Sequence, residues 1–273
     1  MLVYSLTNGQ ESQTAQDTKN GASGWTSLFN GKDLGGWKTF LELRIKKDTG
    51  LTDHNLQKIF QVVNGSIHMY KDSPSEASVP EGFLMTEKEY GNYRLKLEYK
   101  WGTKKFAQRV GRKRNSGLLF HAQDTVGFWP TSIECQVMEG DVGDIYTQNH
   151  AWCTTTIDTI VFDPATKREI ARYSPSGRTY EHGGAGSRRL MHETRLDNSD
   201  GWNTIEILVQ GNEATYFVNG KLSSKLWNIR HVDPQNPGNS KSLLRGRILL
   251  QAEATEILYR NIMIKENLPV GGR

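Results

Sequence analysis

Between Tyr93 and Trp101 the sequence alternates at every position between large apolar and charged side chains. The apolar members of this stretch are Tyr93, Leu95, Leu97, Tyr99 and Trp101. Successive side chains of a β-strand point to opposite faces, so a strand places all of the apolar residues on one side. The pattern therefore predicts a half-buried strand with one face in water, and it commits this part of the chain to a sheet.

Short segments of the same kind recur along the chain, and tight-turn signals separate several of them. Asn64-Gly65 and Asn219-Gly220 are pairs that accept positive φ at both turn positions and favour hairpins. Strands are expected at 59–63, 66–70, 83–86, 116–121, 132–138, 205–209, 214–218, 247–251 and 256–264. Many short strands, with no repeat at a propeller or solenoid period, indicate an all-β sandwich or barrel.

Composition excludes several classes of protein. The chain of 273 residues has no apolar run near the ~18 residues that a membrane span requires. Its net charge of +4 is small for a dedicated nucleic-acid binder. Its two cysteines, Cys135 and Cys153, are too few for a disulfide scaffold or a four-cysteine zinc site, and either a bridge or two free thiols fits the sequence.

The chain is expected to form one folded unit over residues 21–268. Residues 1–20 are mostly polar and aperiodic, and they suggest either a frayed terminus or a linker after a missing signal or lipid anchor. Residues 269–273 form a short C-terminal tail. Three weakly patterned stretches, 38–58, 102–114 and 163–201, are expected to be long loops.

Polar side chains fall on one face of two expected strands. Glu134 and Gln136 share a face of 132–138, whereas Ile133, Cys135 and Val137 oppose them as core residues. His121 faces them if the strand 116–121 pairs with 132–138. A carboxylate beside an imidazole supplies a base and an acid near neutral pH. This face is either a ligand groove or the solvent face of an antiparallel sheet.

Further candidates surround this pair of strands. Glu139 lies at an odd offset from Glu134, so only a bulge or the end of the strand would bring both carboxylates to one site. Glu139, Asp141 and Asp144 lie in a Gly-rich turn that suggests either a divalent cation such as calcium or a solvated turn. His150 is a candidate acid–base group. Trp129, in a loop, is a candidate for stacking on a sugar ring.

Five ordered motifs resemble the 3-keto-disaccharide hydrolase-like family, also called domain of unknown function 1080. They are WTSLFNGKDLGGW at 25–37, NSGLLFH at 115–121, IECQV at 133–137, GWNTIEILVQGNEATYFVNG at 201–220 and GRILLQAEATEILYRNIMI at 246–264. The resemblance implies a concanavalin-A-like jelly-roll β-sandwich of two antiparallel sheets. It also implies an extracytoplasmic bacterial protein, periplasmic, cell-surface or secreted, that acts on carbohydrate.

Family members with an assigned activity cleave glycosides already oxidised to a ketone at C3. By motif position the resemblance assigns His121, Glu134 and Gln136 to the site, with Gln251 and Glu253 on the closing strand. We expect His121, Glu134 and His150 to be catalytic. We expect Trp129, Gln136, Glu139, Gln251 and Glu253 to bind substrate. Many relatives have Asp-His after the glutamine where this chain has Ala252-Glu253, and the basic loop 104–114 is an insertion.

Two functions from different classes follow from these expectations. The first is a hydrolase or lyase that abstracts the proton at C2 of a 3-keto-glycoside and eliminates the substituent at C1. The second is a non-catalytic glycan-binding, lectin-like module on the same sandwich, since the fold does not determine the function.

Overall fold

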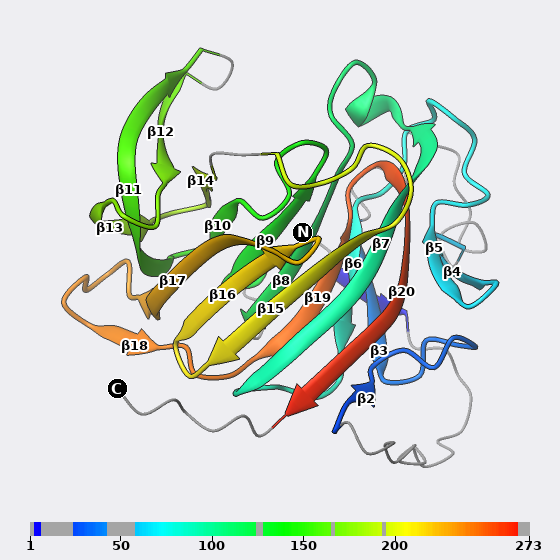
Figure 1. Ribbon diagram of the computed structural model, residues 1–273. Helices are drawn as coiled ribbons and strands as arrows, with labels where there is room; N and C mark the ends of the chain where they lie inside the picture. The colour runs from blue at the N-terminus through cyan, green and yellow to red at the C-terminus, as the bar shows by residue number, and fades with distance from the viewer. Residues whose placement is uncertain are drawn as a thin grey trace.

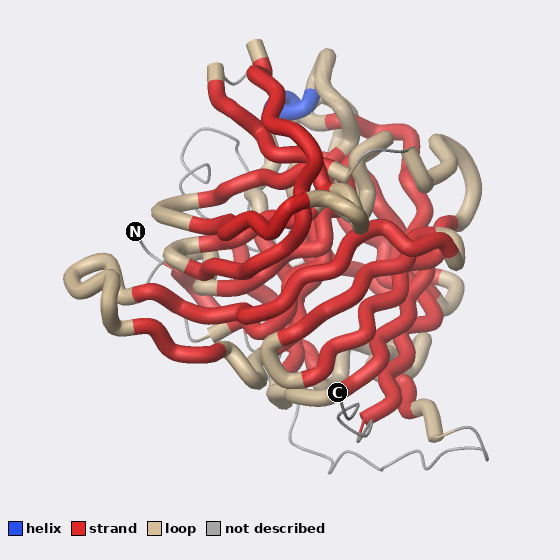
Figure 2. Tube along the Cα trace, turned by 60° about the vertical axis from the view of Figure 1, so that its left-hand side comes forward, coloured by secondary structure: helices blue, strands red, loops and turns tan. Residues whose placement is uncertain are grey.

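A computed structural model describes residues 3–6, 24–42, 58–123, 128–164, 167–192 and 195–266. Over these residues the chain is almost entirely β-strand, with one short 3-10 turn, η2, at Ala107–Arg109. Figure 1 shows the strands arranged in two layers, and Figure 2 shows neighbouring strands running side by side through the body of the molecule. The concanavalin-A-like jelly-roll sandwich expected from the sequence is therefore confirmed.

The first half of the chain contributes strands β1 to β10. They are β1 (Val3–Leu6), β2 (Thr26–Ser27), β3 (Trp37–Glu42), β4 (Phe60–Val63), β5 (Ser66–Met69), β6 (Gly82–Thr86), β7 (Tyr93–Lys105), β8 (Asn115–Ala122), β9 (Ser132–Met138) and β10 (Ile145–Gln148). The second half contributes β11 (Ala151–Asp163), β12 (Arg168–Tyr173), β13 (Arg178–Gly183), β14 (Ser187–Met191), β15 (Asn203–Gln210), β16 (Glu213–Val218), β17 (Lys221–Val232), β18 (Ser240–Ser242), β19 (Arg247–Ala252) and β20 (Thr255–Glu266).

The strands form two sheets that share the long strand β17. Sheet A runs in the order β1, β3, β6, β19, β8, β9, β10, β14 and continues into β11–β13 and β18. Sheet B runs in the order β17, β16, β15, β7, β20, β5, β4, with β2 also paired to β20. Neighbouring strands in both sheets pair antiparallel, except for β12 and β14, which form a parallel pair where sheet A continues past β14.

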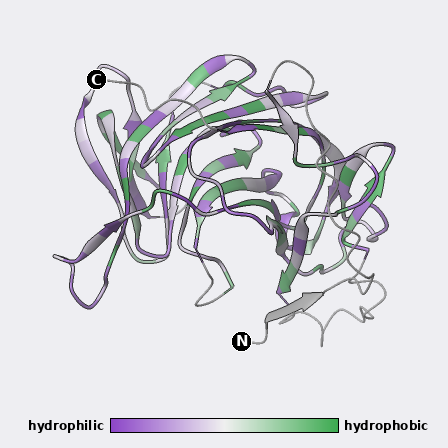
Figure 3. Ribbon diagram, turned by 90° about the horizontal axis from the view of Figure 1, so that it is seen from below, coloured by the Kyte–Doolittle hydropathy of each residue, from purple (hydrophilic) through white to green (hydrophobic). Residues whose placement is uncertain are grey.

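The main core fills the space between the sheets. Along a strand of sheet A, successive side chains point alternately into this core and to the opposite face of the sheet. On β8, Leu118 belongs to the main core and Leu119 to a second, smaller cluster, and on β19 Leu250 and Leu249 divide in the same way. This alternation is the two-residue period of a strand buried on both faces, and Figure 3 shows hydrophobic and hydrophilic positions along the strands.

The Asn-Gly pairs make the hairpin turns that the sequence predicts. Asn64 and Gly65 have φ of 49° and 73°, and Asn219 and Gly220 have φ of 49° and 77°. Both central residues of such a turn need positive φ, which asparagine and glycine tolerate. The turns connect β4 to β5 and β16 to β17.

Several expectations about the organisation of the chain differ from the structure. Of the stretches expected to be loops, residues 38–42 lie in β3 and residues 102–105 end β7. Residues 43–57 of the first stretch lie outside the described residues. The stretch 163–201, expected to be a loop, contains β12, β13 and β14. These strands lie beside the end of sheet A and carry many exposed polar side chains, so they lack the apolar alternation that marks a half-buried strand. In addition, the segment 1–20, which was expected to lie outside the fold, contains β1, and β1 pairs with β3. An edge strand is held by main-chain hydrogen bonds, which need no apolar pattern.

Among the residues that the structure describes, no helix is long and apolar enough to cross a membrane. The C-terminal tail 269–273 lies outside the described residues.

Candidate functional site

The face of sheet A that is turned away from sheet B carries a cluster of buried polar side chains, and we call it the site face. Strands β8 and β9 pair with Gly117 opposite Gln136 and Leu119 opposite Glu134. Opposed residues of an antiparallel pair share a face. Glu134 and Gln136 therefore project from the site face, as the alternation predicts, and both are buried.

Glu134 is the most strongly perturbed acid on this face. Its residue exposure is 2%, and its Oε2 accepts a hydrogen bond of 2.7 Å from Nε2 of Gln148 on β10. Burial and the nearby charge of Glu253 raise the pKa of Glu134 to about 8, although the Gln148 hydrogen bond opposes that rise. A carboxyl with this pKa is mostly protonated near neutral pH and can serve as a general acid.

A glycine makes room for the functional groups of two other strands. A Cβ atom at Gly117 would lie 2.3 Å from Oε1 of Glu134 and 2.1 Å from Oε1 of Gln251. These two oxygens are therefore at most about 4.4 Å apart, directly above the β8 backbone. Oε1 of Gln251 is buried and has no hydrogen-bond partner among the described residues.

Glu253 provides a second acid beside Glu134. It follows β19, and its Oε2 lies 2.6 Å from a guanidinium nitrogen of Arg109. The side-chain amide of Asn115 also donates to this oxygen. Burial raises the pKa of Glu253, and Arg109 and Asn115 oppose that rise. The site face thus brings together two carboxyls in unlike surroundings, since Glu253 pairs with a cation and Glu134 accepts from a neutral amide.

An apolar cluster adjoins the polar groups on the same face. It consists of Phe83, Met85, Leu119, Ala122, Phe128 and Leu249, with Phe40 and Trp129 packed against it. The Phe83 ring lies 5.5 Å from that of Trp129, and Phe83 pairs directly with Gln251 across β6 and β19. Trp129 remains partly exposed, so its ring offers a flat surface for stacking at the border of the polar cluster.

The structure does not bring His121 to Glu134. His121 has φ of 50°, and the register between β8 and β19 shifts at this point, which indicates a β-bulge. The bulge turns the imidazole toward sheet B, where Nε2 donates to the Gly211 carbonyl over 2.9 Å. Burial lowers the pKa of His121 to about 4, so the ring is neutral near physiological pH. The expected pairing of His121 with Glu134 fails because the bulge breaks the alternation.

His150 lies in the turn between β10 and β11, with φ of 65°. Its backbone N–H donates to the Gly184 carbonyl, and its carbonyl accepts from the Val232 N–H. The structure records no contact between the His150 imidazole and Glu134 among the described residues. On β10 the residue that reaches Glu134 is Gln148, two positions earlier.

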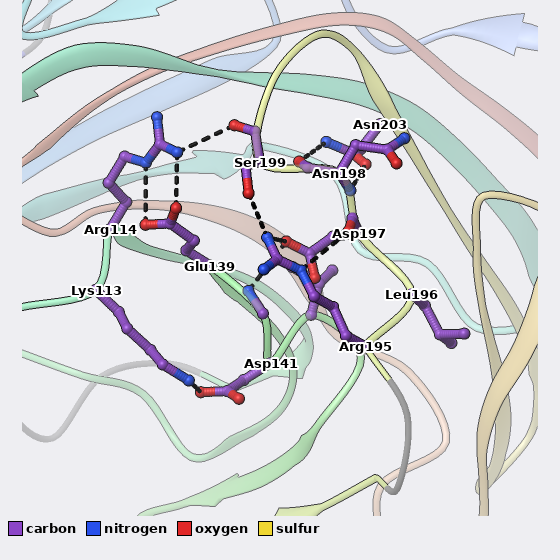
Figure 4. A network of polar contacts seen from close by, with 12 residues as sticks. Lys113, Arg114, Glu139, Asp141, Arg195, Leu196, Asp197, Asn198, Ser199 and Asn203 are labelled. Carbon is purple, nitrogen blue, oxygen red and sulfur yellow. Dashed lines mark hydrogen bonds and ion pairs between the residues drawn. The ribbon is translucent and has the colours of Figure 1, made fainter.

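Glu139 belongs to a separate network of ion pairs, shown in Figure 4. Its carboxylate accepts two hydrogen bonds from the Arg114 guanidinium, with distances of 2.8 and 3.2 Å. This pairing holds the pKa of Glu139 below its usual range. Glu139 comes after the end of β9, and nothing in the described structure joins its carboxylate to that of Glu134.

The acidic turn after β9 is occupied by cationic side chains. Asp141 pairs with Lys113 at 2.7 Å, and Asp144 pairs with Arg189 at the same distance. Within the described ranges, no group of three or more His, Cys, Asp or Glu side chains has the arrangement of a metal site. Calcium at this turn stays a prediction from the sequence, and the present geometry does not fit it because the carboxylates already pair with cations.

Two residues of the site carried little signal in the sequence. Gln148 lies in the short strand β10, and Arg109 lies in the basic insertion. Six cations in that insertion suggest only a general positive charge, so the sequence could not single out Arg109. Both cysteines, in contrast, are settled by the structure as free, buried thiols.

Three solved structures are similar to this chain in fold. A candidate glycosyl hydrolase from Parabacteroides distasonis matches with a TM-score of 0.52 at 22% identity, over 90% of this chain and 95% of that one. A second one from the same organism matches with a TM-score of 0.48 at 16% identity, over 89% and 99% of the two chains. The carbohydrate-binding module CBM66 from Bacillus subtilis matches with a TM-score of 0.41 at 8% identity, over 70% and 84%.

At these identities the first likeness supports the fold alone. No protein of curated function matches the sequence significantly. A family model described as the 3-keto-alpha-glucoside-1,2-lyase-like domain matches residues 24–265, which span every strand from β2 to nearly the end of β20. The chain therefore belongs to the 3-keto-alpha-glucoside-1,2-lyase-like domain family.

Proposed function

We propose that this protein is a carbohydrate-active hydrolase or lyase that cleaves 3-keto-glycosides by elimination. The observation that carries the proposal is the pair of carboxyls on the site face, of which Glu134 is buried and Glu253 is half-buried. Glu253 has a cation at 2.6 Å, and the recorded hydrogen-bond partner of Glu134 is a neutral amide. Burial raises the pKa of both carboxyls, and the Arg109 cation opposes that rise at Glu253, so unlike surroundings let the pair supply an acid and a base at one pH.

The chemistry of a 3-keto-glycoside matches such a pair. The C3 ketone acidifies the C2–H bond because the electron pair left behind spreads onto the ketone oxygen. A carboxylate takes that proton, the C1=C2 double bond forms, and the C1–O bond breaks. A carboxylic acid gives its proton to the departing oxygen. Addition of water across the double bond then yields the free 3-keto-sugar, which completes a hydrolysis.

In this proposal Glu134 is the acid and Glu253 is the base. The sequence alone suggested Glu134 as a base or a metal ligand, with His121 or His150 as its proton partner, but its raised pKa favours the protonated form. Arg109 and Asn115 both donate to Oε2 of the Glu253 carboxylate. The amides of Gln136 and Gln251 would bind sugar hydroxyls or the enolate oxygen, and Trp129 would stack on the sugar ring.

The test is turnover of 3-keto-glucosides that differ in linkage and in the aglycone, followed by chromatography and mass spectrometry of the products. We expect release of the aglycone and a fall in kcat of about 10²–10⁴-fold in Glu134→Gln and in Glu253→Gln. The matched control is Glu266→Gln, because Glu266 pairs with Lys88 at the surface. The corresponding glycosides with an intact C3 hydroxyl should not react.

Absence of turnover with every 3-keto-glucoside would overturn the proposal. Calorimetric binding of unmodified glycans without any product would instead support a glycan-binding module on the same face. In that case Glu134→Gln would change affinity and no rate.

A further inference from the structure

The basic insertion between β7 and β8 sends one side chain to the pair of carboxyls. Arg109 is the last residue of η2, and its side chain is 19% exposed. Its guanidinium lies 2.6 Å from Oε2 of Glu253, which also accepts from Asn115 on the site face. Glu253 is therefore anchored by one charged and one neutral donor. An ionised carboxylate is the partner that such a pair of donors stabilises.

Glu134 has the opposite surroundings. Its Oε2 takes the Gln148 amide, and its Oε1 lies within about 4.4 Å of Oε1 of Gln251 above Gly117. Two acceptor oxygens at this position repel each other when the carboxyl is ionised. A proton on Glu134 Oε1 would turn that oxygen into a donor, and the nearby Gln251 oxygen is an acceptor without a partner among the described residues.

Five further titratable groups interact electrostatically with one or both acids in the described part of the chain, and they are neutral near physiological pH. They are Tyr70 after β5, Cys135 on β9, Tyr146 on β10, Tyr216 on β16 and Tyr259 on β20, and burial raises the pKa of each. Arg189, which lies near Tyr146, pairs with Asp141 and Asp144. Within the described part of the chain, the cation that contacts one of the two acids is Arg109, which pairs with Glu253.

We propose that Arg109 is a positioning residue that keeps the negative charge of this pair on Glu253 and the proton on Glu134. The charge held on Glu253 in turn disfavours a second charge on Glu134, since like charges nearby in a buried site oppose one another. The inserted loop thereby decides which carboxyl is the acid and which is the base. This inference rests on the proposed function for its catalytic meaning, whereas the placement of the proton is a property of the free protein.

The placement of the proton can be measured without substrate. Protein labelled with ¹³C at the glutamate carboxyls is titrated by NMR, and Glu134→Gln and Glu253→Gln assign the two signals. In the native chain we expect Glu253 to be ionised and Glu134 to be protonated at about pH 7. In Arg109→Gln we expect the Glu253 signal to move toward its protonated position at this pH. Arg109→Lys should restore the ionised signal.

The matched control is Arg112→Gln, an exposed arginine of the same loop, which should leave both signals unchanged. Circular dichroism and Tm confirm that each variant is folded. An ionised Glu134 in the native chain would overturn the inference, because the Gln251 amide would then point its nitrogen at the carboxylate. An unchanged Glu253 signal in Arg109→Gln would overturn it as well.

A kinetic measurement separates this inference from the proposed function. With a 3-keto-glucoside, Arg109→Gln should lower kcat at about pH 7 by at least about tenfold and displace the pH profile, and Arg109→Lys should recover most of the rate. If the native chain has no turnover but the NMR pattern holds, the proposed function fails and the charge placement stands. If turnover is present and Arg109→Gln changes neither the NMR signals nor the pH profile, only this inference fails.

Discussion

Gln148 on β10 and Glu134 on β9 are diagonal neighbours on the site face, and the Gln148 amide nitrogen donates to Glu134 Oε2 over 2.7 Å. This contact fixes one oxygen of the buried acid and leaves the other above Gly117. The position and the protonation of the Glu134 carboxyl are therefore controlled by residues of β8, β10 and β19. Substitutions on β8, β9 and β10 test the site.

Glu134→Gln should flatten the fall in stability between about pH 4.5 and 8. Because the folded pKa of about 8 exceeds the unfolded value of about 4.5, the stabilisation by protonated Glu134 is full below about pH 4.5, declines above that pH, and is lost completely as the pH rises through about 8. Each pKa unit corresponds to about 1.4 kcal/mol, so the variant should exceed the native chain by a few kcal/mol near pH 9. Urea unfolding at several pH values measures this difference. A native chain whose stability stays level across that range would contradict the raised pKa.

Gln148→Leu should raise the pKa of Glu134 further. The amide hydrogen bond stabilises the ionised carboxylate, and its loss removes about 1–3 kcal/mol of that stabilisation. The pH at which the unfolding free energy stops falling should therefore rise from about 8 by about one unit or more. A transition that moves to lower pH would show that Gln148 stabilises the protonated form instead.

Gly117→Ala should damage the site without unfolding the protein. The added methyl would meet the Glu134 and Gln251 oxygens at 2.3 and 2.1 Å, so both side chains must move. A displacement of about 1 Å can cost about 10²-fold in rate. The control is Gly238→Ala, whose Cβ would lie 3.6 Å from its nearest neighbour, at an ordinary contact distance. Native-like activity in Gly117→Ala would argue against a catalytic role for this face.

His121→Asn should lower stability and leave turnover by the folded protein unchanged. The imidazole is fully buried and bonded to the Gly211 carbonyl, and loss of such a contact costs about 1–3 kcal/mol. Its folded pKa of about 4 lies below the unfolded value of about 6.5, so its stabilising contribution is present above pH 6.5 and is lost as the pH falls through 4. The variant should show a weaker loss of stability over this acid range. A large fall in kcat in a folded His121→Asn variant would instead indicate that His121 takes part in the reaction.

Strands that are half-buried or fully buried could be predicted from the sequence. The stretch from Tyr93 to Trp101 lies within β7, and 132–138 coincides with β9. Apolar alternation and buried runs reflect burial directly, and burial drives the folding of these segments. Strands β12 to β14 could not be predicted in this way because their exposed polar residues follow no such pattern.

The candidate site could be predicted only in part. Glu134 and Gln136 lie on one face because the side-chain period of a strand is two, and this holds wherever the strand is unbroken. His121 was misplaced because a bulge near the end of β8 interrupts that period. Bulges depend on the register with the neighbouring strand, which local sequence does not specify.

The sequence by itself determined that this chain forms a β-sandwich and that an acid and an amide share one face of a central strand. Only the tertiary structure decided which other groups meet that acid. Arg109 and Glu253 are 144 residues apart, and Gln148 reaches Glu134 from a different strand. Local periodicity reports which way a side chain points, whereas strand order and register decide what stands opposite it, and these emerge when distant strands pack together.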